Sequence, residues 1–445
     1  MTSPGPSSSV ATPSASRLRS ERRAALLTLI ALFAITHLSI VLFAPHAAST
    51  SEASDQNLYH YPVIQTMVEQ WPAIDLVHYQ STTSPGYHLV MAGVASVLGD
   101  ELTVLQLVSS LGTLAMLIIV WWPMQRRLGG WTALAWTAPL IVSSYVIGAS
   151  AWLTTDNWAW AFVALALGGA IFNAPTAAAL ASWGIAATAA VFIRQVHLWV
   201  AGAPWLAALF VPAAMRWRSV PAWIPMLLPF ALMATFYVMW DGLTPPAFRD
   251  KHNVGMNPAS LCVILSLVAA YGVWFMPAWL PSSRRALPRH PLVWGVAIVV
   301  LIFSVLIETT YAPKPDGRWG GVIWEFVRRA PSIGTTSLVL PVTSMAGVLV
   351  IGRAIEAARA HGRARGSAIL VLALAGFSAA QMMNSMAWQR YVEPLVLMAV
   401  AWLSVLALAP QTSETRRARL GPVILAGGLL LLSGITVYRP VFLGS

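Results

Sequence analysis

Long apolar segments separated by short polar ones fill most of this chain. Segments long enough to cross a bilayer, or nearly so, lie at 24–44, 103–123, 131–149, 157–173, 176–192, 197–214, 220–240, 258–280, 291–310, 333–352, 367–387, 390–409 and 420–437. A transmembrane helix needs about 20 predominantly apolar residues, and fewer where it is packed inside a bundle. The pattern predicts an all-α fold, a polytopic transmembrane helix bundle of about thirteen spans over residues 21–445.

The segment between the first two spans, residues 45–102, is long and polar, and we expect it to form the outer catalytic loop. Large apolar residues recur in it at helical spacing, at Tyr59, Val63, Met67 and Trp71. This spacing predicts an amphipathic helix lying along the membrane surface. Residues 87–99 are apolar but too short to span, so we expect a second helix there at the interface.

Composition and charge agree with a membrane protein and suggest an orientation. The chain is 57% hydrophobic and only 10% charged, whereas soluble proteins carry roughly 25% charged residues. With the N-terminus in the cytoplasm, most arginines fall in the inner loops and most acidic residues in the outer ones, which follows the positive-inside rule. The net charge of +11 therefore indicates cytoplasmic loops and not nucleic-acid binding. Arg far outnumbers Lys, which is typical of GC-rich bacteria, so we expect a bacterial plasma membrane.

Two further features limit the possible functions. Residues 1–16 are rich in Ser, Pro and Ala, so we expect residues 1–20 to be a disordered cytoplasmic N-terminus. The single cysteine, Cys262, cannot form an internal disulfide, and the chain has no zinc-binding spacing, no HExxH and no Gly-rich phosphate loop. These absences leave only a multispan membrane protein at this stage.

Carboxylates that follow apolar segments are the candidate catalytic groups. Asp55 lies where the predicted surface helix begins, so it is either a helix N-cap, as Ser54 also could be, or a general base. Asp156 in "TTDNW" presents the same choice, since it could cap a helix that starts at Asn157.

Cations at membrane depth are the candidate binding groups. Arg194 and Gln195 lie between two apolar runs in "VFIRQVHLW". A charge there is costly, so Arg194 either pairs with Asp156 or Asp55, or binds an anionic phosphate. The segment "AFRDKHN" supplies three more cationic or titratable residues, which are either a solvated loop face or phosphate ligands: Arg249, Lys251 and His252.

Five stretches in this order resemble a known family: "DQNLYHYPVIQTMVE", "TTSPGYHL", "TTDNW", "FIRQVHLW" and "DGLTPPAFRDKHN". The chain is similar to the dolichyl-phosphate-glucose α-1,2-glucosyltransferases of the GT-C superfamily of membrane transferases. The resemblance covers about residues 24–260, and "WQRYVEP" near the end fits a late GT-C helix. Gln56 stands where the family tends to have a second acid, which favours a bacterial relative that uses polyprenyl phosphate.

The resemblance implies a hexosyltransferase that uses a polyprenyl-phosphate sugar donor and a glycan or lipid-linked acceptor, by inverting displacement on the outer membrane face. It implies Asp55 as the base and Asp156 as the second acidic position of the catalytic site, and it implies a reaction that needs no metal and no cofactor. The substrate-binding residues would be His60, Tyr61, Arg194, Gln195, Arg249, Lys251, His252 and Arg390. A transporter or flippase for lipid-linked sugars, or a non-catalytic binding protein, would show similar spans and remains an alternative.

Overall fold

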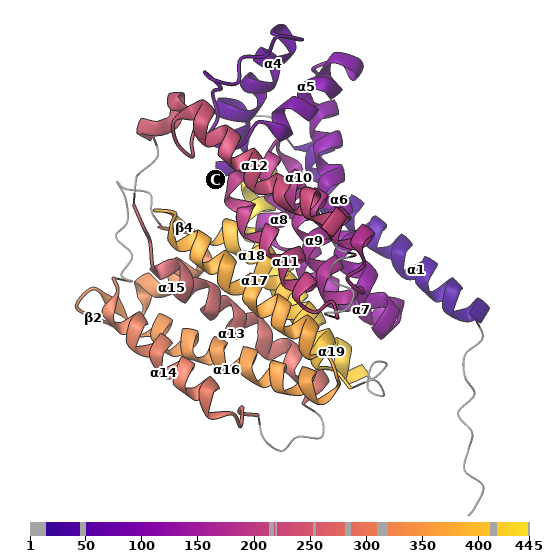
Figure 1. Ribbon diagram of the computed structural model, residues 1–445, viewed down its shortest axis with the longest axis vertical. Helices are drawn as coiled ribbons and strands as arrows, with labels where there is room; N and C mark the ends of the chain where they lie inside the picture. The colour runs from indigo at the N-terminus through magenta and orange to yellow at the C-terminus, as the bar shows by residue number, and fades with distance from the viewer. Residues whose placement is uncertain are drawn as a thin grey trace, which may run out of the picture.

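The computed structural model describes residues 15–44, 50–212, 218, 220–251, 255–280, 286–308, 319–409 and 416–443, and these form a bundle of helices with very short strands (Figure 1). The helices of the first half are α1 (Ala15–Phe33), η1 (Ala34–Leu38), α2 (Ser39–Phe43), α3 (Ser51–Asp55), η2 (Gln56–His60), α4 (Tyr61–Glu69), α5 (Gly86–Leu98), α6 (Leu102–Leu128), α7 (Gly130–Ile141), α8 (Ser144–Ala151), α9 (Asp156–Phe172), α10 (Ala177–Ile193), η3 (Gln195–Ala201) and α11 (Gly202–Leu209).

The second half contains α12 (Trp223–Trp240), η5 (Pro246–Lys251), α13 (Ala259–Trp279), α14 (Pro291–Leu306), α15 (Val322–Arg329), α16 (Val339–Ala360), α17 (Ala364–Met382), α18 (Gln389–Ala407), α19 (Arg416–Ser433), η7 (Gly434–Tyr438) and α20 (Arg439–Phe442). Two two-stranded pairs accompany them. β1 (Trp319–Gly320) runs parallel to β4 (Ala387–Trp388), and β2 (Ser332–Ile333) runs antiparallel to β3 (Thr336–Ser337).

The prediction of an all-α, polytopic membrane fold is confirmed. Among the described residues, eight helical stretches are long and apolar enough to cross a membrane: Leu18–Phe43, Leu102–Leu128, Val220–Trp240, Ala259–Trp279, Val339–Ala360, Ala364–Met382, Gln389–Ala407 and Ala418–Phe442. The predicted span 131–149 is broken into α7 and α8, which meet at 73°. Helices α9, α10 and α14 have 17, 17 and 16 residues.

The prediction of one regular span over residues 197–214 is wrong. The seven-residue 3₁₀ helix η3 leads there into α11, which has eight residues. Pro204 lies near the start of α11 and has no backbone N–H to donate one turn back. The residues before it therefore lack one α-helical hydrogen bond, which favours the tighter 3₁₀ winding.

Close packing at the bundle centre depends on small residues, as is usual where helices pass each other in a membrane. A Cβ atom added to Gly347 of α16 would lie 2.1 Å from the Leu265 carbonyl oxygen, and one added to Gly421 of α19 would lie 1.8 Å from that of Trp274. Both carbonyls belong to α13. Glycine therefore allows α16 and α19 to contact the backbone of α13 directly.

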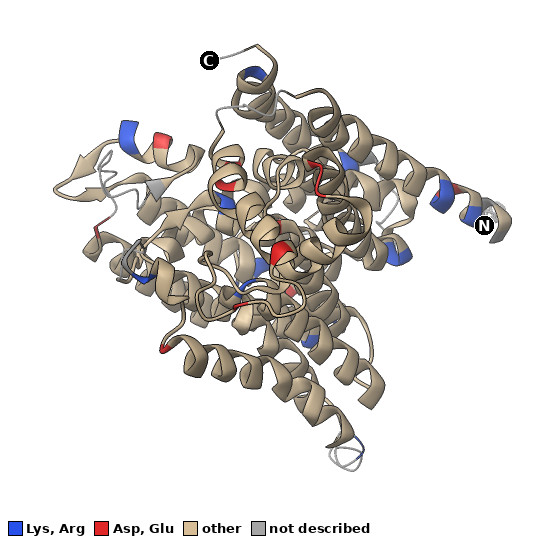
Figure 2. Cartoon of the chain, turned by 90° about the horizontal axis from the view of Figure 1, so that it is seen from above, with Lys and Arg blue, Asp and Glu red and all other residues tan. Residues whose placement is uncertain are grey.

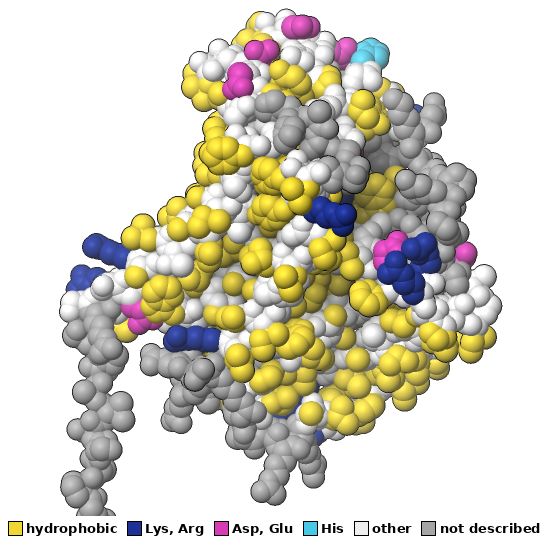
Figure 3. Space-filling model, turned by 180° about the vertical axis from the view of Figure 1, so that it is seen from behind, with side chains coloured by type: hydrophobic (Ala, Val, Ile, Leu, Met, Phe, Trp, Pro, Cys, Tyr) yellow, Lys and Arg dark blue, Asp and Glu magenta, His cyan; other side chains and the backbone are white. Residues whose placement is uncertain are grey.

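Arginines close one end of the bundle. Arg363 donates to the carbonyl oxygens of Val405 and Leu408 at 2.6 and 2.8 Å, where α18 ends. Arg365 donates in the same way at the end of α9. Cations suit helix C-termini because unpaired carbonyls and the helix dipole place negative charge there. The side of the molecule seen in Figure 3 is broadly apolar, with a few scattered charged side chains.

The first loop is helical, as predicted, but its buried face differs from the prediction. α3, η2 and α4 follow one another without a break, and α4 packs on α5. Val63 and Met67 are buried, whereas Tyr59 is partly exposed and Trp71 is 59% exposed beyond the end of α4. The apolar face of this helix therefore packs against protein.

The expected N-terminal boundary needs a correction. Residues 1–14 lie outside the described residues, and α1 begins at Ala15. Residues 15–20 are therefore helical, and the charged run "RLRSERR" extends the first apolar helix by about two turns.

Candidate active site

Two acid–arginine pairs lie at the end of the bundle opposite the capping arginines. Asp55 of α3 contacts Arg390 of α18 at 2.8 Å between Oδ2 and Nη2. Asp156, the first residue of α9, forms an ion pair with Arg194, which follows the last residue of α10. All four side chains are less than one-third exposed. Seen from above, acidic and basic positions lie near one another in the middle of the molecule, and other charged positions lie further out (Figure 2).

Neither carboxylate is a helix cap. Thr50 is the N-cap of α3, where its hydroxyl accepts from the Ala53 N–H at 3.2 Å, so Asp55 lies a turn inside the helical run. Thr155 precedes α9 and no side chain caps that helix. The capping alternatives for Asp55, Ser54 and Asp156 are therefore wrong. Of the two alternatives for Arg194, pairing with Asp156 is present in the structure.

Tyr391 lies between the two pairs. The Cζ atom of Arg194 is 5.2 Å from the centre of its ring, and that of Arg390 is 5.0 Å away. Arg390 also donates to the Tyr391 hydroxyl at 3.1 Å and lies 4.6 Å from the ring centre of Trp388. These cation–π contacts hold both guanidinium groups against aromatic faces. The two ion pairs therefore form one connected polar cluster.

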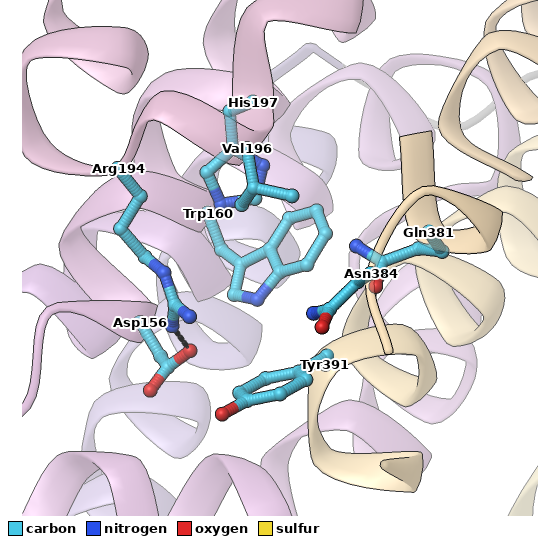
Figure 4. A pocket seen from close by; sticks show the side chains of 8 residues that line it. All are labelled: Asp156, Trp160, Arg194, Val196, His197, Gln381, Asn384 and Tyr391. Carbon is cyan, nitrogen blue, oxygen red and sulfur yellow. Dashed lines mark hydrogen bonds and ion pairs between the residues drawn. The ribbon is translucent and has the colours of Figure 1, made fainter. Parts of the chain in front are cut away.

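A small cavity of about 40 Å³ adjoins this cluster (Figure 4). It has room for about three water molecules. Its walls combine charged, aromatic and amide side chains, namely Asp156, Trp160, Arg194, Val196, His197, Gln381, Asn384 and Tyr391. In Figure 4 the amides of α17 and the following turn face Arg194 across the cavity, and the Tyr391 hydroxyl points towards Asp156. Such walls suit a ligand with hydroxyl groups and negative charge.

His60 is partly buried and belongs to a hydrogen-bonded chain whose other members, His88 and Tyr79, are buried. Its Nδ1 is 2.9 Å from Nε2 of His88, and Nδ1 of His88 in turn contacts the Tyr79 hydroxyl. Burial lowers the pKa of His60 to about 4. The charge of Asp55 raises this pKa, and the charges of Arg194 and Arg390 lower it further. His60 is therefore neutral at pH 7 and close enough to the cluster to be influenced by three of its four charges.

Gln195 and Gln56 brace the loops around the site. The Gln195 side chain accepts from the Ser84 N–H at 2.8 Å and donates to the Thr82 carbonyl at 2.7 Å, which fixes the "TTSPG" turn. Gln56 is fully buried, and its Oε1 accepts from Gln106 and from the Leu153 N–H. A neutral amide suits that position because a buried carboxylate would be costly there.

Glu393 fixes the first turn of α18. It is fully buried and accepts hydrogen bonds from Ser143, Tyr271 and Gln389 at 2.6, 2.6 and 2.5 Å. Ser143 lies in the break between α7 and α8, and Tyr271 lies on α13. These bonds set the rotation of α18, and hence the direction in which Arg390 projects.

Two further predicted residues, Tyr61 and Arg249, have contacts of their own outside the cluster. The Tyr61 hydroxyl donates to the Asp100 carbonyl at 3.0 Å, at the outer side of the loop. Arg249 donates to the carbonyls of Trp240 and Asp241 and so closes the end of α12. The structure does not bring Tyr61 or Arg249 to the ion pairs. The side chain of Lys251 and all of His252 lie outside the described residues.

Several site residues were not predicted. Tyr391 is the most important, followed by others that line the cavity or support His60: Trp160, His197, Gln381, Asn384, His88 and Tyr79. His88 and His197 lie in "TTSPGYHL" and "FIRQVHLW", two of the stretches that carry the family resemblance. Gln381, a polar residue near the end of an apolar helix, was a signal that could have been used.

Within the described part of the chain, no group of three or more His, Cys, Asp or Glu side chains could hold a metal ion. The expectation that the reaction needs no metal stays a prediction.

No protein-family model and no curated protein matches this chain. Among solved structures, the chain is similar to the crystal structure of ArnT from Cupriavidus metallidurans in the apo state. The sequence identity is 14%, the TM-score is 0.40, and the match covers 87% of this chain and 78% of that one. A likeness of this degree says nothing about activity.

Proposed function

We propose that this chain is a GT-C-type glycosyltransferase of a bacterial plasma membrane. It moves a hexose from a polyprenyl-phosphate donor to an acceptor hydroxyl, on the face of the membrane opposite the cytoplasm. The observation that supports this most is the joining of the Asp55–Arg390 and Asp156–Arg194 pairs around Tyr391 at one end of the apolar helices. Charged groups at such a depth mark a substrate site by default.

The proposed reaction is a single inverting displacement. Asp55 takes the proton from the acceptor hydroxyl, and the acceptor oxygen forms a bond to the anomeric carbon as the bond from that carbon to the phosphate oxygen breaks. The polyprenyl phosphate leaves with the electron pair of the broken bond. Because it leaves as an anion, it needs no strong acid, and arginines can stabilise the charge where it develops.

Donor binding requires the cluster to rearrange. A sugar is much larger than the 40 Å³ cavity, so side chains must move when it enters. Arg390 holds Asp55 in the unliganded protein. We expect the donor phosphate to replace the carboxylate at this guanidinium, since the guanidinium group of arginine suits phosphates as well as carboxylates. Asp55 would then be free to accept the proton. Arg194 and Asp156 would orient the sugar.

Replacement of Asp55 tests the proposal. With a radiolabelled polyprenyl-phosphate hexose in proteoliposomes, Asp55→Asn should lower turnover by about 10²–10⁴-fold, which is the usual contribution of a general base. Binding of the donor should persist, because Arg390 remains. Asp75→Asn is the matched control, since Asp75 lies in the same loop, where its carboxylate contacts the exposed His78 ring and the N–H groups of Val77 and His78. Undiminished turnover by Asp55→Asn would remove Asp55 as the base.

The same proteoliposomes test the transporter reading. The 73° break between α7 and α8 is a feature that secondary transporters also show. Movement of the intact donor to the other leaflet, without release of polyprenyl phosphate, would favour a flippase. Release of polyprenyl phosphate in the presence of a crude membrane acceptor fraction is the result expected of a transferase.

A further inference from the structure

A second cavity, of about 190 Å³, lies at the other end of the bundle. It is an open cavity bordered by the start of α1, the end of α6 and the start of α7, and its polar lining is Glu21, Arg22, Gln125, Arg126 and Arg127. α6 has 27 residues and is therefore about 40 Å long. Its first residue follows α5 and the first loop, and its last residue lines this cavity. The two cavities therefore lie near opposite membrane faces.

The charge of this cavity is predominantly positive. Three guanidinium groups line it, against one carboxylate, that of Glu21. Among the residues that the structure describes, none of the three arginines has a carboxylate oxygen within 4 Å. Arg126 lies over the ring of Trp122 at 5.2 Å, and Arg127 over that of Phe172 at 5.1 Å. Cations held on aromatic faces keep their N–H edges available for an anion.

Two uncharged features of the lining also suit a ligand. α7 begins at Gly130 without a side-chain cap, and the first N–H groups of a helix lack intrahelical partners and attract anions. Gln125 is 2% exposed, lines the same cavity, and has no hydrogen-bond partner for Oε1. A ligand with both a phosphate and a hydroxyl or ammonium donor would satisfy both features.

The surroundings favour a lipid over a soluble molecule. Leu27 of α1 is 66% exposed and Trp122 of α6 is 47% exposed, so apolar surface lies beside the charged lining. Acyl chains could cover that surface while the headgroup enters the cavity. Basic pockets between transmembrane helices at the membrane surface bind lipid headgroups in this way.

We propose that this cavity binds an anionic phospholipid through its headgroup phosphate, with Arg22, Arg126 and Arg127 as the phosphate ligands. The bound lipid would join α1 to the α6–α7 turn. This site is separate from the proposed transferase site, and the proposal does not depend on that activity.

The test counts retained lipid. The full chain is purified from nanodiscs of phosphatidylcholine containing a minority of phosphatidylglycerol, and native mass spectrometry measures phosphatidylglycerol that stays bound. The double variant Arg22→Gln/Arg126→Gln should weaken retention by about tenfold or more, because each arginine near a membrane attracts anionic lipid. Arg127 is kept, since it packs on Phe172. The matched control is Arg23→Gln/Arg359→Gln, which removes two exposed charges outside the cavity.

Each outcome decides the proposal. Loss of retention in the cavity variant alone supports it. Equal loss in both double variants overturns it, because general surface charge would then explain the lipid retention. No loss in either variant also overturns it, because the cavity arginines would then not hold the lipid. A separate arm adds inorganic phosphate in detergent and follows the melting temperature. The contrary result is that phosphate raises the melting temperature of the unsubstituted chain but not that of the cavity variant, while neither retains lipid selectively. That result would identify the ligand as a soluble anion and overturn the proposal of a lipid.

Discussion

A double-mutant cycle on Asp55 and Arg390 tests whether this pair holds the first loop against α18. The changes are Asp55→Asn, Arg390→Gln and the two together. Each single change leaves one charge without its partner at a position less than one-third exposed. Arg390→Gln also removes the contacts with the rings of Trp388 and Tyr391. The double variant leaves no unpaired charge. Its loss of unfolding free energy should therefore be smaller than the sum of the losses in the two single variants.

The geometry gives the expected size. At 2.8 Å and an effective dielectric constant of about 20, the gross attraction is about 6 kcal/mol. Desolvation of two partly buried groups opposes most of it, so we expect a coupling energy of about 2 kcal/mol, between the values for exposed and buried pairs. Glu325 and Arg328 on α15 are the control pair, because they are 2.5 Å apart but 40% and 43% exposed. Their coupling should be about 0.3 kcal/mol.

Equilibrium unfolding of the purified chain by SDS in mixed micelles measures these free energies. Coupling energies are obtained as the difference between the double variant and the sum of the singles. If Asp55 and Arg390 couple no more strongly than Glu325 and Arg328, the ion pair does not join the loop to the bundle. The proposal that donor phosphate releases Asp55 from Arg390 would then lose its basis.

Two other predictions concern His60 and Gly421. Because burial lowers the pKa of His60 from 6.5 to about 4, the unfolded chain binds a proton that the folded chain does not, and stability falls as pH drops from 6.5 towards 4. His60→Gln should therefore reduce the loss of unfolding free energy between pH 7.5 and 5.0 by about 2 kcal/mol, and an unchanged slope would contradict the assignment. Gly421→Ala should lower the free energy of unfolding by about 1–3 kcal/mol or more, because the added Cβ atom would lie 1.8 Å from the Trp274 carbonyl oxygen. Gly427→Ala on the same helix has open space and should be neutral or slightly stabilising, so equal effects would refute the close packing.

The pattern of apolar residues was sufficient to predict where the helices lie. It was not sufficient to predict where those helices are irregular or broken. The apolar runs placed most spans correctly because burial in lipid requires long apolar helices. The same runs did not distinguish the 3₁₀ segment η3 from a regular helix, since its composition is equally apolar. The break at Val142 and Ser143 was missed for the same reason. Irregular backbone is stabilised there by groups from other helices, including Glu393, which accepts from Ser143.

The pairing within the candidate site depends on helix rotation, which a sequence pattern does not encode. Placing Asp55, Asp156, Arg194 and Arg390 on one side of the membrane needed only the alternation of spans. The pairing of acids with arginines depends on α18, because this helix carries Arg390. Of its apolar stretch, 89% is buried inside the bundle. Glu393 fixes the rotation of that helix through Ser143 and Tyr271, and Arg390 then faces Asp55. Tyr391 follows Arg390 in the chain, so the same rotation places its ring against Arg194. A single buried carboxyl group thus links the bundle core to both ion pairs.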